Sequence, residues 1–163
     1  MRNFRIMMMI VAILMASTSL TAQVQRVTTT LNGSGQVGMW GFPCTLTITP
    51  DGKGVIKGEA TKEVSAVTIN FKTQQRDILY EAIKGNGFMW SYIKDITVSP
   101  FSMKEEQQHS TITPKGNGKF NGITDTNTKD IKFYVRFPIA TDTDKGQSVL
   151  DINFTFTKNV TNR

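Results

Sequence analysis

Regular alternation between apolar and polar side chains constrains the fold of this chain more than any other feature. In the clearest run, apolar residues occupy every second position, as Ile131, Phe133, Val135, Phe137 and Ile139. A second run places Leu150, Ile152, Phe154 and Phe156 in the same way. Successive side chains of a β-strand point to opposite faces, so both runs predict strands with one buried and one solvated face. This pattern is typical of antiparallel sheets.

Segments rich in glycine, proline and aspartate separate the alternating runs at hairpin spacing. Residues 50–54 (PDGKG), 114–118 (PKGNG) and 141–146 (TDTDKG) contain the residue types that favour tight turns. A first strand is expected over residues 24–31, and shorter runs occur at 40–49, 55–60, 67–72 and 119–123. Short strands joined in this way predict an all-β fold, an antiparallel eight- to nine-stranded barrel or sandwich.

Residues 73–84 (TQQRDILYEAIK) interrupt this rhythm and allow two interpretations. Four apolar residues fall at helical spacing, namely Ile78, Leu79, Ala82 and Ile83. Thr73 can cap such a helix and Gly85 can end it. As a strand, the same segment would place Ile78, Tyr80 and Ala82 on one face. We favour one short helix near residues 74–84 and keep the strand as the alternative.

The first 22 residues have the layout of a secretory signal peptide. Arg2 and Arg5 supply a positive start, an apolar run (IMMMIVAILM) follows, and small residues lead to Ala22. The apolar run is about half of the roughly 20 residues that a membrane-spanning helix needs, which favours cleavage over a retained anchor. We therefore expect residues 1–22 to be removed and residues 23–163 to form a single exported β-barrel domain, periplasmic or extracellular.

Charge and cysteine content argue against two classes of protein. The chain has a net charge of +6, which falls to +4 once the two arginines of the signal peptide are removed. The basic residues are spread singly, whereas a nucleic-acid-binding protein needs a basic patch or stripe. Cys44 is the one cysteine, so no intramolecular disulfide can form, which argues against a small extracellular domain stabilised by disulfides. It shares an apolar row with Phe42 and Leu46, which predicts that its thiol is buried.

Few residues in the chain suit catalysis. His109 is the one histidine, which excludes a zinc site built on two or three imidazoles. It lies in a polar stretch, residues 104–110 (KEEQQHS), that we expect to be a surface loop. The acids available for a hydrolytic pair are Glu59, Glu63, Glu81 and Asp95, and their spacing singles out no pair. We expect no enzyme activity, no metal site and no cofactor.

Four aromatic residues are the candidates for a ligand site, namely Trp40, Phe88, Trp90 and Tyr92. They come from predicted strands that would face one interior in a barrel. Inward side chains of a small barrel either line a pocket for one small molecule or fill the interior. Core packing is the favoured role, because large aromatic side chains usually serve it.

The sequence Gly38-Met39-Trp40, on an early strand ahead of the turn at Asp51-Gly52, resembles the G-x-W motif of the calycin superfamily, which includes the lipocalins. Chain length, strand count and a single-domain layout agree with this calycin-like, lipocalin-like resemblance. It implies an up-and-down barrel of eight to ten strands that holds a small apolar ligand or a partner protein. Arg136 is the candidate for the family's late-strand arginine, which packs on the tryptophan.

These observations predict an exported soluble binding or interaction module, with a small ligand or a protein as its partner and no stable membrane insertion. A periplasmic inhibitor or immunity-type protein is one alternative, and it shares the fold. A small outer-membrane β-barrel is the other. The predicted strands at 55–60 and 119–123 are shorter than the about 9 to 11 residues that such a barrel needs to span the bilayer.

Overall fold

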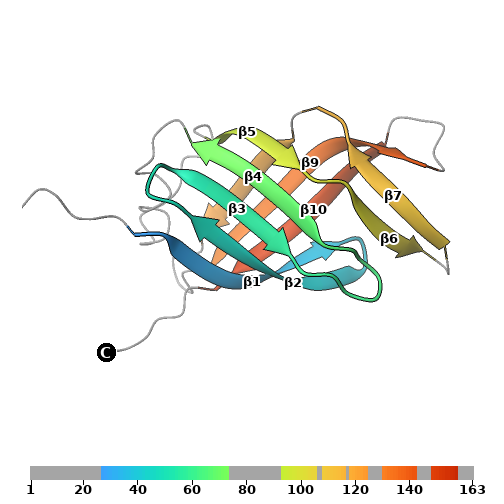
Figure 1. Ribbon diagram of the computed structural model, residues 1–163, viewed down its shortest axis with the longest axis horizontal. Coiled ribbons are helices and arrows are strands. Elements are labelled where there is room, and N and C mark those ends of the chain that lie inside the picture. The colour runs from blue at the N-terminus through green and yellow to red at the C-terminus, as the bar shows by residue number, and fades with distance from the viewer. Residues whose placement is uncertain are drawn as a thin grey trace, which may run out of the picture.

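The computed structural model shows one antiparallel sheet of ten strands that curls strongly into a half-barrel (Figure 1). It describes residues 27–73, 93–105, 108–116, 118–124, 130–142 and 148–157. The prediction of an all-β antiparallel fold is confirmed, and the strands form one sheet instead of the two packed sheets of a sandwich. The predicted signal peptide and the segment 74–84, expected as a short helix, lie outside the described residues.

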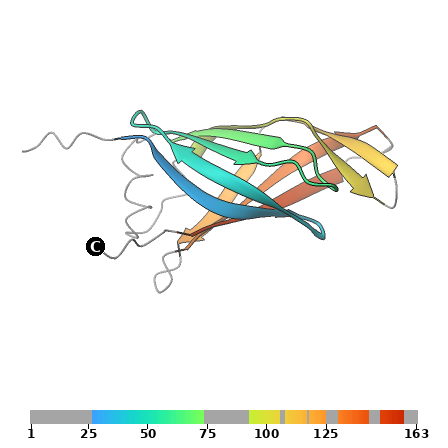
Figure 2. The ribbon, with the colours of Figure 1, turned by 60° about the horizontal axis from the view of Figure 1, so that its bottom comes forward.

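The strands follow the chain as β1 (Thr29–Val37), β2 (Trp40–Ile48), β3 (Lys53–Gly58), β4 (Val67–Thr73), β5 (Ile93–Val98), β6 (Phe101–Glu105), β7 (Gln108–Pro114), β8 (Lys119–Thr124), β9 (Ile131–Thr141) and β10 (Ser148–Phe156). Their order in the sheet is β5-β4-β3-β2-β1-β10-β9-β7-β6, and β8 also pairs with β9. The first strand, β1, therefore lies beside the last one, β10. Figure 2 shows the strong bend of the whole sheet.

The two ends of this strand order are consecutive in the chain, because only Ser99 and Pro100 separate β5 from β6. β5 pairs with β4, and β6 continues along the segment that leads into β4. Val64 and Met103 form an antiparallel bridge there, and the Ser65 amide donates to the Ser102 carbonyl at 2.9 Å. The borders of the half-barrel are thus joined along this part of their length.

The long hairpin of β9 and β10 has the register that the alternating pattern predicts. Val135 lies opposite Ile152 and Phe133 opposite Phe154, and all four side chains are buried. Slipping one strand by a single residue would turn these side chains to solvent, so the apolar rows determine the pairing.

Two expectations about strand positions were wrong. β1 extends to Val37, whereas the first strand was expected to end at Leu31, and it includes Gly33 and Gly35, a residue type that is depleted in strands. The polar stretch 104–110, expected as a loop, belongs in its described part to the β6–β7 hairpin, in which Lys104 pairs with His109. Both errors have one physical cause: the missed segments, 32–37 and the described part of 104–110, are paired through the backbone, although Val37 is their one β-branched residue and they contain no aromatic residue except His109.

The apolar rows of the described strands turn toward one interior and form a single core. Its largest buried side chains include Phe137, Phe154 and Phe156, which are at most 1% exposed. Among the described residues, no helix is long and apolar enough to cross a membrane.

Candidate functional site

Trp40 is the one candidate ligand residue within the described part of the chain. It follows the two-residue turn at Gly38 and Met39 and is the first residue of β2. Gly38 has a positive φ of 56°, which the first position of a type II′ hairpin turn requires. The three positions of the G-x-W motif therefore form a turn and a strand start, whereas we expected them within one strand. The Trp40 side chain is partly buried and packs against the core.

The other three candidates, Phe88, Trp90 and Tyr92, lie outside the described residues. The described strands on either side of them end at Thr73 and begin at Ile93. These two residues pair at the end of the sheet where β2 turns into β3, which is opposite the end that carries Trp40. The expected grouping of four aromatic side chains around one ligand stays a prediction.

Phenylalanine rings fill the described interior. Ring contacts run from Phe42 through Phe154, Phe156, Phe133 and Phe120 to Phe71, with centroids 4.8 to 6.2 Å apart. These rings are at most 6% exposed. They come from β2, β4, β8, β9 and β10, so the contacts cross the interior from one wall to another. These six phenylalanines therefore pack the described interior.

Glycines on the inner face make room for these rings. A Cβ atom at Gly54 would lie 2.2 Å from the Phe71 ring, and one at Gly35 would lie 2.4 Å from the Phe42 ring. Real Cβ atoms do not approach other atoms so closely, so each ring occupies the space of an absent side chain. The interior is packed to the backbone at these two places.

Arg136, the candidate partner of Trp40, lies on the outer face of β9. Its guanidinium donates to both carboxylate oxygens of Asp151 on β10, at 2.8 and 2.9 Å. The hydrogen bond from Arg136 holds the pKa of Asp151 below its ordinary value. Trp40 is on the inner face, so the arginine expected from the calycin resemblance is engaged elsewhere.

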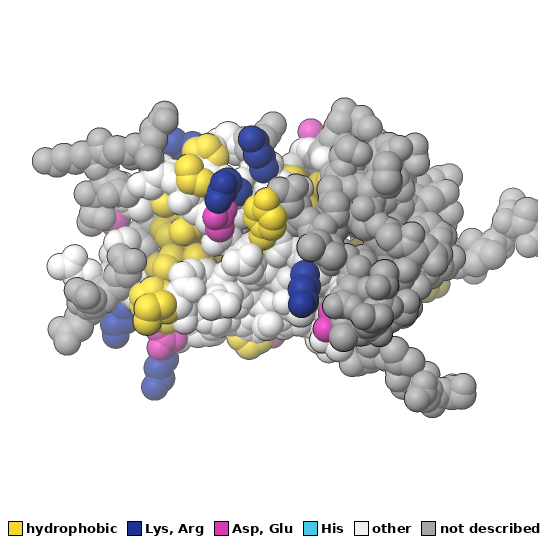
Figure 3. Space-filling view, turned by 180° about the vertical axis from the view of Figure 1, so that it is seen from behind, with side chains coloured by type: hydrophobic (Ala, Val, Ile, Leu, Met, Phe, Trp, Pro, Cys, Tyr) yellow, Lys and Arg dark blue, Asp and Glu magenta, His cyan; other side chains and the backbone are white. Residues whose placement is uncertain are grey.

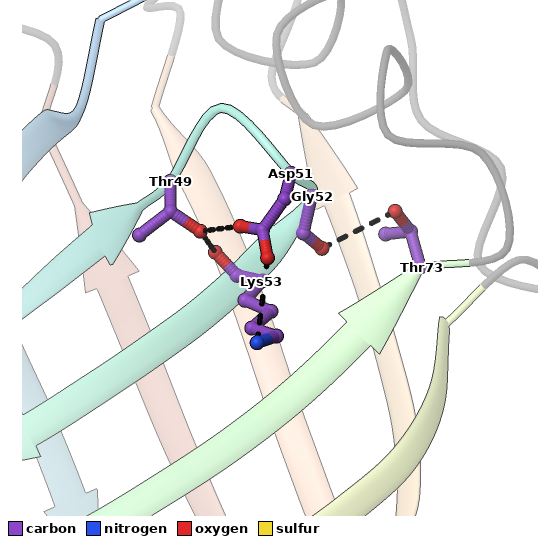
Figure 4. Close-up of polar contacts among 5 residues, drawn as sticks. All are labelled: Thr49, Asp51, Gly52, Lys53 and Thr73. Carbon is purple, nitrogen blue, oxygen red and sulfur yellow. Dashed lines mark hydrogen bonds and ion pairs between the residues drawn. The ribbon is translucent and has the colours of Figure 1, made fainter.

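The turn between β2 and β3 carries a compact set of polar contacts (Figure 4). The Thr49 hydroxyl donates to the Asp51 carboxylate, which lowers the pKa of Asp51, and the Lys53 ammonium lies 3.4 Å from the same carboxylate. The buried Thr73 hydroxyl donates to the Gly52 carbonyl at 3.4 Å. These contacts attach the turn to the end of β4 and have a structural role.

The remaining titratable candidates do not converge. Glu59 follows β3, Glu63 precedes β4, and Asp95 lies exposed on β5, while Glu81 is outside the described residues. His109 is exposed on β7. Among the residues that the structure describes, no three His, Cys, Asp or Glu side chains lie close enough together to hold a metal ion.

Cys44 is buried on the inner face of β2, as its apolar row predicts. Burial raises the pKa of its thiol to about 12, and the nearby charge of Glu59 contributes in the same direction. A thiol with this pKa stays protonated at neutral pH and is a poor nucleophile.

No family model, no curated protein and no solved structure matches this chain. The arrangement of the described side chains is therefore the basis for any functional proposal.

Strand pairing brings together lysines that are far apart in the sequence. Lys53 on β3 lies directly opposite Lys72 on β4, and the next register position, on β5, is Lys94. We call these three positions the lysine row. Sequence reasoning missed it because the three lysines are spread over 42 positions of the chain. Only the register of the β3–β4 and β4–β5 pairs brings them together.

The outward positions of β1, β2 and β10 have a different character. They carry mainly hydroxyl and amide side chains, among them Thr30, Asn32, Ser34, Gln36, Thr45, Asn153 and Thr155. Figure 3, which views the molecule from the side opposite to Figure 1, shows on its described part backbone and uncharged polar atoms, several hydrophobic groups and scattered charges. The lysine row is thus a local feature of the β3–β4 face.

Proposed function

We propose that this protein is an exported binding module that recognises a protein partner with the outer surface of its curled sheet. The packed phenylalanine interior is the observation that carries the proposal. A small apolar ligand in this part of the sheet would have to displace rings that are at most 6% exposed. Recognition by the outer surface leaves this packing intact.

A calycin-like fold is part of the proposal. One curled antiparallel sheet in which the first strand pairs with the last supports it. The turn position of Gly38 and Met39 and the outward direction of Arg136 weigh against a close relationship. An inhibitor or immunity-type role is a form of the same function, because such proteins also bind through their surface.

The direction of the side chains favours this module over an outer-membrane barrel. Membrane barrels carry an apolar band outside and polar residues inside. Here the phenylalanines of the described strands point inward, and Lys57, Asn70 and Lys132 are exposed on the outer face. This arrangement suits an aqueous environment such as the periplasm or the extracellular space.

A small apolar ligand near Trp40 is the second candidate function. Trp40 is only partly buried, and Met39 beside it is 87% exposed. Apolar surface at this end of the sheet is therefore in contact with solvent. The packed middle of the interior is not.

Native mass spectrometry beside a pull-down from the native cell envelope tests the proposal. We expect the exported protein to have the mass of residues 23–163 alone and to capture a protein partner in a fixed ratio. The unfolded variant Val135→Asp serves as the capture control. A small molecule bound in a one-to-one ratio and released on denaturation would contradict the proposal and favour the site near Trp40.

A further inference from the structure

We propose that the lysine row on the outer face of β3 and β4 is the docking site for an acidic segment of a partner protein. This inference rests on the proposed function and adds the place of binding and the chemistry of the partner.

The first support is the direct opposition of two like charges. Lys53 and Lys72 are cross-strand partners in an antiparallel pair, and both are exposed. Side chains in this relation have Cβ atoms about 4.5 to 5.5 Å apart, and like charges there destabilise the sheet. The next partner of Lys72 in register is Lys94, so a third lysine, and no acid, occupies the neighbouring position.

The core determines this register, but it does not require these residue types. Ile56 lies opposite Ile69 on the inner face of the same strands, and both side chains are fully buried. A one-residue slip would expose them, so the strands cannot move to separate the charges. An uncharged polar residue in place of Lys53 or Lys72 would remove the repulsion and leave the core unchanged.

A second like-charge pair in the same sheet shows what compensation looks like. Lys119 lies opposite Arg136, and on the other side of Arg136 the register partner is Asp151. That carboxylate accepts two hydrogen bonds from the guanidinium and balances its charge. In the lysine row, the position that corresponds to Asp151 is Lys94.

Among the described residues, nearby carboxylates balance the lysine row only in part. Asp51 reaches the Lys53 ammonium at 3.4 Å, but both side chains are more than half exposed, so solvent screens the pair. Asp95 is exposed on β5, one residue beyond the position of Lys94. Lys57, exposed on the same face of β3, adds a further cation. Residues that lower stability without helping the core are typical of binding surfaces.

The size of the lysine row favours a protein as its partner. Three register positions on neighbouring strands span about 10 Å. DNA-binding surfaces make more contacts, about 6 to 10 phosphates in well-studied cases. Between the two ends of β3 the outward residue is the half-buried Val55, so the row presents no apolar wedge for a bilayer. A few carboxylates on one acidic segment fit this footprint and can make charge-assisted hydrogen bonds with the ammonium groups.

Binding of a fluorescein-labelled oligoglutamate peptide, followed by anisotropy, tests the inference on the mature protein. We expect the double variant Lys53→Gln/Lys72→Gln to bind about tenfold more weakly than the wild type, because it loses the facing charges. The control Lys115→Gln/Lys132→Gln removes the same net charge from exposed positions elsewhere and should change binding less than about twofold. Equal weakening by both variants would overturn the inference, since only net charge would then matter.

Two further measurements make the test decisive. Lys72→Gln should raise the urea midpoint of unfolding, whereas Lys132→Gln should leave it unchanged; an unchanged midpoint for Lys72→Gln would contradict the repulsion argument. Vesicles containing phosphatidylglycerol and a DNA duplex serve as competing probes. Tighter, row-dependent binding to either of them than to oligoglutamate would overturn the assignment to a protein partner. If oligoglutamate binding does not depend on the row while a native protein partner is captured, only the docking site is wrong and the proposed function stands.

Discussion

At the scale of single residues, Cys44 shows how burial changes the chemistry of a side chain. Its thiol is 3% exposed among apolar neighbours, and its pKa is raised to about 12. In the unfolded chain the same thiol ionises near pH 8.5. Because the folded state keeps its proton to higher pH, the thiol contributes stability below pH 8.5 that is lost as the pH rises toward 12.

We predict that a thiol reagent labels Cys44 at pH 8 much more slowly in the native protein than in urea. The free energy of unfolding of Cys44→Ala should be about 1 kcal/mol lower at pH 7, and this difference should shrink above pH 9. Urea melts of both proteins across this pH range measure the effect. Native labelling as fast as labelling in urea would show that the thiol faces solvent.

Asp95 has a backbone conformation that few side chains tolerate. Its φ is 53°, and it lies where the register between β4 and β5 shifts, as expected for a β-bulge. Aspartate tolerates this left-handed region better than most residues, and β-branched residues tolerate it poorly.

We therefore predict that the free energy of unfolding of Asp95→Val is about 1 to 2 kcal/mol lower than that of Asp95→Gly. Urea melts of both variants measure this difference. The matched change Thr97→Val, at an exposed position of the same strand, should stay within about 0.5 kcal/mol of wild type. Equal stabilities for Asp95→Val and Asp95→Gly would contradict a left-handed conformation at this position.

At the scale of elements, the hairpin of β9 and β10 has the most strongly determined pairing. Each strand contributes buried side chains at every second position, and Val135 is fully buried opposite Ile152. On the other face, Lys132 lies exposed opposite Thr155. The two faces of one strand therefore offer a direct comparison.

We predict that Val135→Asp unfolds the domain, because it places an unpaired charge in the core. Lys132→Asp should remain within about 0.5 kcal/mol of wild type. Far-ultraviolet circular dichroism and urea melts of the purified variants measure both effects. Equal stability of the two variants would mean that the assignment of inner and outer faces is wrong.

The same contrast explains which elements could be predicted from the sequence. β9 and β10 were predictable because their alternation is long and uninterrupted. The extent of β1 was not, because Gly33 and Gly35 are of a residue type that is depleted in strands, and only the Phe156 and Phe42 rings that fill the space above them explain their use in a strand. The burial of Cys44 followed from its apolar row. The lysine row could not be predicted, since it depends on the register of three strands.

At the scale of the whole molecule, glycine positions and phenylalanine rings complement one another. Gly54 on β3 lies beneath the Phe71 ring, and a Cβ atom there would overlap the ring at 2.2 Å. A Cβ atom at the exposed Gly41 would have its nearest neighbour, the Gly35 carbonyl oxygen, 3.8 Å away.

We predict that Gly54→Ala lowers the free energy of unfolding by about 1 to 3 kcal/mol, because the Phe71 ring must move within a packed core. Gly41→Ala should stay within about 0.5 kcal/mol of wild type. Adding Phe71→Leu should recover part of the loss of Gly54→Ala, so that the double variant is more stable than additivity requires. A loss no larger than that of Gly41→Ala would show that the interior is not filled at this place.

The pairing of β1 with β10 also determines when folding can finish. Gly33 and Phe156 are register partners, although they are far apart in the sequence. Contacts between such distant residues form slowly, because a long loop must close first. Until the last strand is available, β1 and β9 each keep an open edge beside exposed phenylalanines, which is a state prone to aggregation. A chain in which β10 has not yet paired therefore cannot complete its sheet, because β10 is the strand that joins β1 to β9.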